Sequence, residues 1–258
     1  MLIGAGAFVL MFFTINAIVV AYALTRDDFA TQDVGNAFER AQAVSAYAVD
    51  RLDAAATGAE LPRPPVILAN QRDLQFSLLV TFLSQVVLVG IVLFASRQTL
   101  RGWARAVGLD RIHPERWWLV IGLVVLVYSA LFAYSVAAAA TGISWLEPNS
   151  TVPSGVSRDN LTLSITALAT LIGAPISEEF FFRGLVFSGL LKWGFWPAAL
   201  VSGAAFSLVH FDPGSVIPFL GIALVMTWVY WRRGSLWDSI AFHFAFNATS
   251  IILLLVTR

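Results

Sequence analysis

Long apolar runs, separated by short polar segments, occupy most of this 258-residue chain. A helix needs about 20 predominantly apolar residues to cross the hydrocarbon core of a bilayer. On this basis the predicted membrane spans are residues 2–24, 74–96, 117–140, 161–191, 197–211, 215–231 and 236–256. The pattern therefore predicts an all-α, polytopic membrane bundle of about seven transmembrane helices.

The first run has a second interpretation, as a secretory signal peptide. Signal peptides have an apolar core of about 7–15 residues with a basic segment before it. Residues 2–24 form a longer run, and no basic residue precedes them. We therefore interpret this run as an uncleaved transmembrane span.

Composition agrees with a membrane location and narrows the candidate chemistry. Hydrophobic residues make up 58% of the chain and charged residues 12%, against about 45–50% and 25% in soluble proteins. Sixteen basic and sixteen acidic residues cancel, so no basic field indicates a nucleic-acid partner. The chain has no cysteine, which leaves His and carboxylates as the strong metal ligands. Arg far outnumbers Lys and Ala is abundant, a bias typical of GC-rich bacterial genomes, so the membrane we expect is a bacterial plasma membrane.

Loop charges predict the orientation, because cytoplasmic loops carry an excess of Lys and Arg. Loop 97–116 has five arginines against two acids, whereas loop 25–73 has five against eight. We expect loop 97–116 and the Arg232-Arg233 turn to be cytoplasmic, and loop 25–73 and residue 258 to be external. Within the external loop, apolar residues at helical spacing over 31–56 predict a helix that lies on the membrane or packs on its own loops. Leu61 to Pro65 is interpreted as a linker.

Ionisable residues inside membrane spans are costly, so each is a functional candidate by default. The first three predicted spans contain none. All candidates follow residue 176: Glu178, Glu179, Arg183, His210 and His243, with Asn247 beside the last. We therefore predict two regions, an N-terminal membrane region at 1–160 and a catalytic membrane core at 161–258.

The two adjacent glutamates are predicted to have different roles. Residues four apart share a helix face, so Glu179 can pair with Arg183. Glu178 lies about 100° further round the helix and is left without a local partner. A buried carboxylate of this kind is a candidate general base. The alternative is that all three residues only join helices, but two acids and one base leave a charge unpaired.

The remaining candidates are predicted to meet Glu178 in one cavity. His243 and Asn247 are four residues apart and share a face, which suits a site or an interhelical hydrogen bond. At about 1.5 Å per residue, Glu178 and His210 both lie about 21 Å from the turn between their spans. The same count places His243 only about 15 Å from the Arg232-Arg233 turn. A helix tilt or a kink at Pro175 must therefore bring His243 to the depth of Glu178 and His210 in the membrane.

These motifs together resemble a known family. They are APISEE at 174–179, FRG at 182–184, FSLVH at 206–210 and DSIAFH at 238–243, followed by Asn247. In this order and spacing they resemble the CPBP family (CAAX protease and bacteriocin-processing, or Abi) of intramembrane proteases, which is related to the type II CAAX prenyl endopeptidases. The resemblance covers residues 160–256, and residues 1–160 resemble no family that we can name.

The resemblance implies a CAAX-type membrane endopeptidase acting on a membrane-associated or lipidated protein or peptide. Glu178 and His210 would activate the attacking water, and Arg183 would steady Glu179. His243 and Asn247 would stabilise the oxyanion.

Metal use stays open at this point, because the family has been described both as metalloproteases and as glutamate-dependent hydrolases. His210, His243 and either Glu178 or Glu179 could form a three-ligand zinc site. Alternatively, Glu178 could act as base and Asn247 as oxyanion donor without metal. We slightly favour the metal-free mechanism, because two histidines outside an HExxH motif provide few ligands for a zinc ion.

Other classes are less well supported. The sequence has no GxSG, HExxH or GxGD motif of the other intramembrane proteases. A non-enzymatic scaffold or a bacteriocin-immunity protein that retains the family core is the alternative function, and a transporter is a third, although the motifs do not form an inverted repeat. The intact set of Glu178, His210, His243 and Asn247 favours the enzyme.

Overall fold

The computed structural model describes residues 2–25, 37–60, 62, 71–148, 156, 159–210 and 212–256. Within these ranges the chain forms helices joined by turns, and no strand is present. Most of the predicted linker Leu61 to Pro65, the start of the predicted helix 31–56 and residue 258 lie outside the described residues. The all-α class predicted from the sequence is confirmed.

Each predicted span corresponds to an apolar helix. They are α1 (Leu2–Leu24), α3 (Gln71–Ser96), α5 (Trp117–Thr141), a long helix from Asn160 to Trp193, α9 (Phe195–Leu208), α10 (Val216–Arg233) and α11 (Leu236–Val256). In the described residues, five of these are long and apolar enough to cross a membrane, whereas Ile3–Val19 of α1 and Phe195–Leu208 are shorter. Helix α9 has 14 residues, or about 21 Å, so the predicted span 197–211 is shorter than a bilayer core of about 30 Å.

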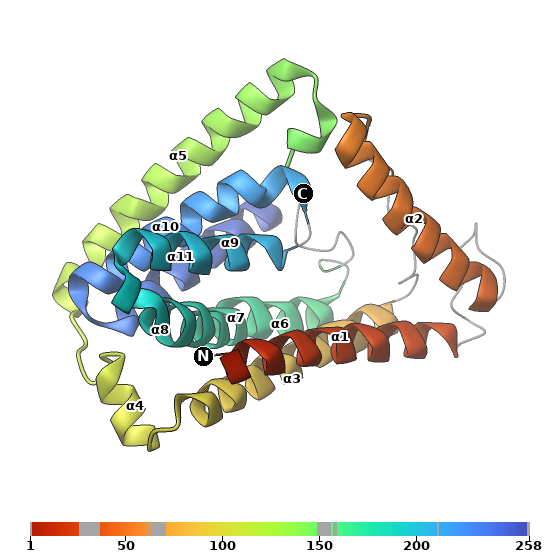
Figure 1. The fold of residues 1–258 in the computed structure, drawn as a ribbon. Helices are drawn as coiled ribbons and strands as arrows, with labels where there is room; N and C mark the ends of the chain where they lie inside the picture. Colours follow the sequence, from red (N-terminus) through yellow and green to blue (C-terminus); the bar gives the residue numbers. More distant parts are fainter. Residues whose placement is uncertain are drawn as a thin grey trace.

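The helix from Asn160 to Trp193, called here the 160–193 helix, lies at the centre of the bundle. Helices α1 and α3 pack on one side of it, and α9, α10 and α11 on the other, with α5 outermost against α10 and α11 (Figure 1). Large side chains fill the interfaces and are almost completely buried: Phe182, Phe187, Phe206, Met226 and Phe242.

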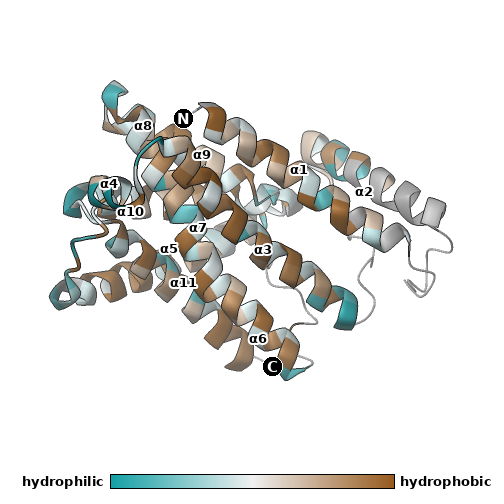
Figure 2. Ribbon diagram, turned by 90° about the horizontal axis from the view of Figure 1, so that it is seen from below, coloured by the Kyte–Doolittle hydropathy of each residue, from teal (hydrophilic) through white to brown (hydrophobic). Residues whose placement is uncertain are grey.

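The outer surface of the bundle is apolar. Phe94, Phe132 and Leu10 are each at least 70% exposed, and hydrophobic residues cover the outward faces of most of the helices (Figure 2). Exposed apolar area on this scale is rare on soluble monomers and marks a membrane or interaction surface. With the five candidate spans, it shows a multi-pass membrane protein.

The 160–193 helix is continuous but changes its winding. It alternates between α-helical and π-helical segments. The α-helical segments are α6 (Asn160–Leu168), α7 (Ala174–Glu178) and α8 (Ser188–Leu190), and the π-helical segments are η4 (Ala169–Gly173) and η5 (Glu179–Phe187). A 3₁₀ turn, η6 (Leu191–Trp193), ends the helix. Proline lacks the N–H of an α-helical bond, and η4 ends at Gly173, two residues before Pro175. π turns therefore flank the segment that contains Pro175, and such turns are frequent at functional sites.

Helix α2 (Ala37–Thr57) corresponds to the helix predicted in the external loop. It stands at the edge of the bundle (Figure 1). Its Arg51 Nη2 lies 3.0 Å from Asp212 Oδ1, in the connection between α9 and α10. Helix α2 is thus joined to the bundle and does not only rest on a membrane surface.

The two Arg-rich connections lie on one side of the bundle, as the charge count predicted. After the short helix α4 (Leu100–Ala106), Val107 O accepts a bond from Leu236 N at 3.1 Å, and Leu109 O accepts one from Trp237 Nε1 at 2.9 Å. Gly108 has a φ of +73°, and a Cβ there would lie 1.9 Å from Gly234 O. That this side is cytoplasmic stays a prediction.

Candidate active site

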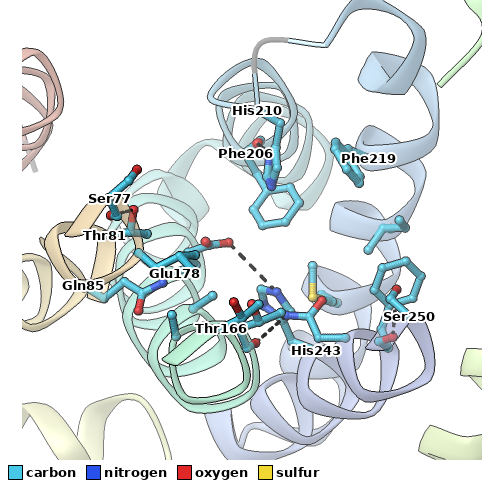
Figure 3. A pocket seen from close by; sticks show the side chains of 18 of the residues that line it. Ser77, Thr81, Gln85, Thr166, Glu178, Phe206, His210, Phe219, His243 and Ser250 are labelled. Carbon is cyan, nitrogen blue, oxygen red and sulfur yellow. Dashed lines mark hydrogen bonds and ion pairs between the residues drawn. The ribbon is translucent and has the colours of Figure 1, made fainter. Parts of the chain in front are cut away.

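A cavity of about 400 Å³ lies between α3, the 160–193 helix and helices α9 to α11. Glu178, His210, His243 and Asn247 all line it. Figure 3 shows Glu178 and His243 facing each other across the space, with His210 on the far wall. The structure thus brings together the four residues chosen from the sequence, and their catalytic roles stay predictions.

Glu179 and Arg183 form the predicted ion pair. Arg183 Nη1 lies 2.8 Å from Glu179 Oε1, and both side chains are completely buried. Arg183 Nη2 also donates to Ala223 O at 3.1 Å, and the guanidinium lies 4.8 Å from the centre of the Phe206 ring. The pair is therefore anchored to α9 and α10 as well as being neutral in itself.

Glu179 has two further partners, on α11, which the sequence analysis missed. His243 Nδ1 lies 3.0 Å from Glu179 Oε1, and Ser239 Oγ donates to Glu179 Oε2. A carboxylate paired with Arg183 can only accept, so His243 Nδ1 carries the proton. Ser239 and His243 are four residues apart on α11, a polar repeat that could have indicated a shared partner.

This bond directs the other imidazole nitrogen toward Glu178. His243 Nε2 lies 4.0 Å from Glu178 Oε2, and Glu178 is 23% exposed while His243 is 7% exposed. Glu178 Oε2 is buried and has no hydrogen-bond partner. As predicted, Glu178 is the carboxylate of the pair that is not held by Arg183, and its partly exposed side chain lines the cavity.

His210 lies just beyond the end of α9, in the turn that follows Leu208. Its Nδ1 lies 2.8 Å from Phe206 O, and because a carbonyl only accepts, this nitrogen is the donor. The ring packs on Phe206 and Phe219, with ring centres 4.9 and 4.3 Å away. In the neutral ring Nε2 is then a proton acceptor.

Asn247 is held against the wider part of the 160–193 helix. Its Nδ2 donates to Thr170 O, in η4, at 2.8 Å. An amide nitrogen has two hydrogens, so one remains for the cavity. The π-helical segment thus fixes the side chain that the sequence analysis assigned to oxyanion binding.

Helix α3 also lines the cavity, which the sequence analysis did not predict. Ser77, Thr81 and Gln85 face the space beside Glu178 (Figure 3). None of the three carries a charge, so they were not among the ionisable residues that the sequence analysis selected. Their spacing of four residues within an apolar span is a signal that could have found them. The proposed boundary at residue 160 stays a prediction, although α3 lies on its N-terminal side.

The described residues do not offer a ready metal site. No three His, Asp or Glu side chains among them are grouped closely enough to hold one ion. His243 Nδ1 is bonded to Glu179 and His210 Nδ1 to the backbone, which leaves Nε2 of both histidines free to accept a hydrogen bond or to bind a metal. The metal-free preference stays a prediction, and no step below uses a metal.

Comparison with known proteins agrees with these motifs. Residues 160–249 match the family model "Type II CAAX prenyl endopeptidase Rce1-like". The match agrees with the resemblance of the C-terminal core to the CPBP family. The matched segment begins at the first residue of α6 and includes every candidate catalytic residue.

Two curated bacterial proteins are similar to the chain. "Putative membrane peptidase YdiL" of Bacillus subtilis (strain 168) is 25% identical over 177 residues, which are 67% of this chain and 69% of the relative. "UPF0177 protein YxdF" of Lactococcus lactis subsp. lactis (strain IL1403) is 32% identical over 74 residues, 28% of this chain and 41% of the relative. No solved structure matches the chain. At the level of the family, these similarities support a membrane peptidase, in a multi-pass protein of bacterial type.

Proposed function

We propose that this protein is a CAAX-type intramembrane endopeptidase that hydrolyses a peptide bond of a membrane-associated or lipidated protein or peptide. The observation that carries the proposal is the position of Glu178, whose side chain lines the cavity, is 23% exposed and has its Oε2 4.0 Å from His243 Nε2. A carboxylate at the wall of a cavity and close to a histidine is the arrangement that a general base requires. The match to the Rce1-like family model supports the same reaction.

In the proposed reaction, Glu178 and the unprotonated Nε2 of His210 orient a water molecule. Glu178 takes a proton from this water as its oxygen attacks the scissile carbonyl. Asn247 donates its remaining N–H to the oxyanion that forms. The carbon–nitrogen bond then breaks, and Glu178 returns the proton to the leaving amine. The products are a carboxylic acid, which keeps the second proton of the water, and an amine, and Glu178 ends in its starting state.

Glu179 positions His243 in this scheme. In its doubly protonated form His243 could donate from Nε2 to the oxyanion while Nδ1 stays bonded to Glu179. The formal charges of the two glutamates, Arg183 and that histidine then sum to zero. A cluster without net charge avoids the large desolvation penalty of an isolated ion in a membrane interior.

The reaction is tested by reconstituting the purified protein with a library of S-farnesylated CAAX, acylated and unmodified peptides. Mass spectrometry should show one internal cleavage in a lipidated peptide by the parent and none by Glu178→Gln. Products with both proteins would point to a contaminating protease. A folded parent that cleaves no peptide would favour the scaffold or immunity protein.

The metal-free mechanism needs its own measurement. We expect the parent to retain activity in chelator and to contain less than stoichiometric zinc by elemental analysis. Zinc at one atom per chain, lost together with activity in His210→Ala or His243→Ala, would overturn this mechanism while leaving Glu178 as the base.

A further inference from the structure

Helix α3 carries a row of polar side chains through an otherwise apolar span, and this polar row consists of Ser77, Thr81 and Gln85. All three line the candidate active-site cavity (Figure 3). They also line a second cavity of about 350 Å³, whose opposite wall is formed by α1. Both cavities include Glu178 and His210. The polar row therefore runs past the reactive residues from one cavity into the next.

The spacing of the polar row matches an extended peptide. Residues four apart on a helix are separated by about 6 Å along its axis. Every second residue of an extended strand is separated by about 6.6 Å. An extended peptide beside α3 would thus present its backbone groups to the three polar side chains in turn. Main-chain bonds of this kind give affinity that does not depend on the peptide's sequence.

Gln85 is the strongest member of the row. Its Oε1 is buried without a hydrogen-bond partner and lies against Gly173, where an added Cβ would approach it to 1.8 Å. The oxygen therefore faces the 160–193 helix. The Nε2 end of the amide lies on the side of Glu178 and the cavity (Figure 3), where a peptide carbonyl is its natural complement. Thr81 donates its hydroxyl to Ser77 O at 2.9 Å and keeps its lone pairs for a further N–H.

We propose that the polar row binds the backbone of the substrate in an extended conformation, with Gln85 as the main anchor beside Glu178. This inference deepens the proposed function and rests on it. Gln85 is a positioning residue in this scheme, since it holds the scissile bond at Glu178 and takes no part in proton transfer. The chain that continues into the second cavity meets the apolar side chains Phe8, Met11 and Phe12 of α1.

The test replaces the amide with an apolar group of similar size, in Gln85→Leu. For the best-cleaved library peptide we expect KM to rise on the order of tenfold, as for one lost hydrogen bond that leaves its partner unpaired. The kcat should change by less than about twofold and the Tm should not fall. Gln85→Asn should recover part of the lost affinity.

Gln75→Leu is the matched control on the same helix. The Gln75 amide bonds to Thr162 Oγ1 at 3.0 Å and to Asp159 at 3.4 Å, and it lies outside both cavities. This variant should lower the Tm and leave KM unchanged. If Gln85→Leu behaves in the same way, Gln85 only joins helices and the inference is wrong.

A substrate scan identifies the backbone contact directly. Each peptide N–H is replaced in turn by an ester oxygen, which weakens the adjoining carbonyl as a hydrogen-bond acceptor with little change in shape. At one position the ester should raise KM for the parent several-fold and leave KM for Gln85→Leu unchanged. Equal effects on both proteins at every position would overturn the inference.

A peptide-binding measurement distinguishes failure of this inference from failure of the proposed function. A fluorescent S-farnesylated peptide is titrated against Glu178→Gln, with and without Gln85→Leu. Weaker binding with Gln85→Leu, together with a parent that cleaves nothing, would refute the protease and keep the backbone site. Cleavage by the parent with equal binding by both variants would refute the backbone site alone. Neither cleavage nor binding would refute both.

Discussion

Neutralising Glu179 should damage folding far more than neutralising Glu178. Glu179→Gln keeps the shape of the side chain but removes the charge that faces Arg183, and Arg183 is completely buried. Breaking a buried pair by removing one partner costs about 3–5 kcal/mol, because the other charge stays buried and uncompensated. For a chain of this size about 1 kcal/mol corresponds to 2–4 °C, so the Tm should fall by roughly 6–20 °C.

Glu178→Gln is the matched comparison. Its side chain is 23% exposed, and its Oε2 lies 4.0 Å from His243 Nε2. Loss of such a partly solvated pair costs no more than about 1 kcal/mol, so the Tm should stay within roughly 4 °C of the parent. Peptide cleavage should nevertheless be abolished, because the proposed base has been removed.

The assay follows tryptophan fluorescence of the detergent-solubilised protein during heating, alongside peptide cleavage. The chain has nine tryptophans, so the unfolding signal is intrinsic. As a control, Arg183→Met added to Glu179→Gln should recover stability, since no unpaired charge remains. Equal Tm values for the two single variants would refute the division of roles between the glutamates.

Three further outcomes are expected. Asn247→Ala should lower kcat on the order of 10²–10³-fold with little change in substrate binding, as for loss of an oxyanion donor; single-turnover rates check this. Hydrogen bonds from the side chain and the backbone N–H of Thr162 lower the pKa of Asp159 to about 2. This carboxylate therefore stabilises the fold above its unfolded pKa of about 4, and its contribution should disappear between pH 4 and 2, so the Tm difference from Asp159→Ala should shrink over that range. Gly108→Ala should lower the Tm far more than Gly142→Ala, because both have positive φ but only Gly108 faces a backbone carbonyl, 1.9 Å from the added Cβ.

The sequence was sufficient for features that depend on local geometry. Hydropathy located every apolar helix of the bundle, because a spanning segment must satisfy its backbone bonds internally. The Glu179–Arg183 pair was predictable because its partners are four residues apart on one helix. The same spacing argument left Glu178 outside the pair, and its buried Oε2 has no hydrogen-bond partner in the described structure.

The features that the sequence did not predict depend on packing between distant segments. The bond from His243 to Glu179 joins residues 64 apart and requires α11 to lie against the 160–193 helix. The polar row on α3 was missed because uncharged groups in a span usually join helices, and only the cavity shows that these face a shared space. The π turns depend on hydrogen-bond register near Pro175, for which residue type is a weak guide.

The order of Glu179's partners along the chain bears on how the protein is made. Arg183 lies in the same helix as Glu179, whereas Ser239 and His243 follow 60 and 64 residues later. During synthesis the 160–193 helix can therefore enter the membrane with this pair already neutralised. His243 joins Glu179 only after α11 has been inserted. We expect a nascent chain to be inactive until that point, which protects neighbouring proteins at the site of membrane insertion from an unfinished enzyme.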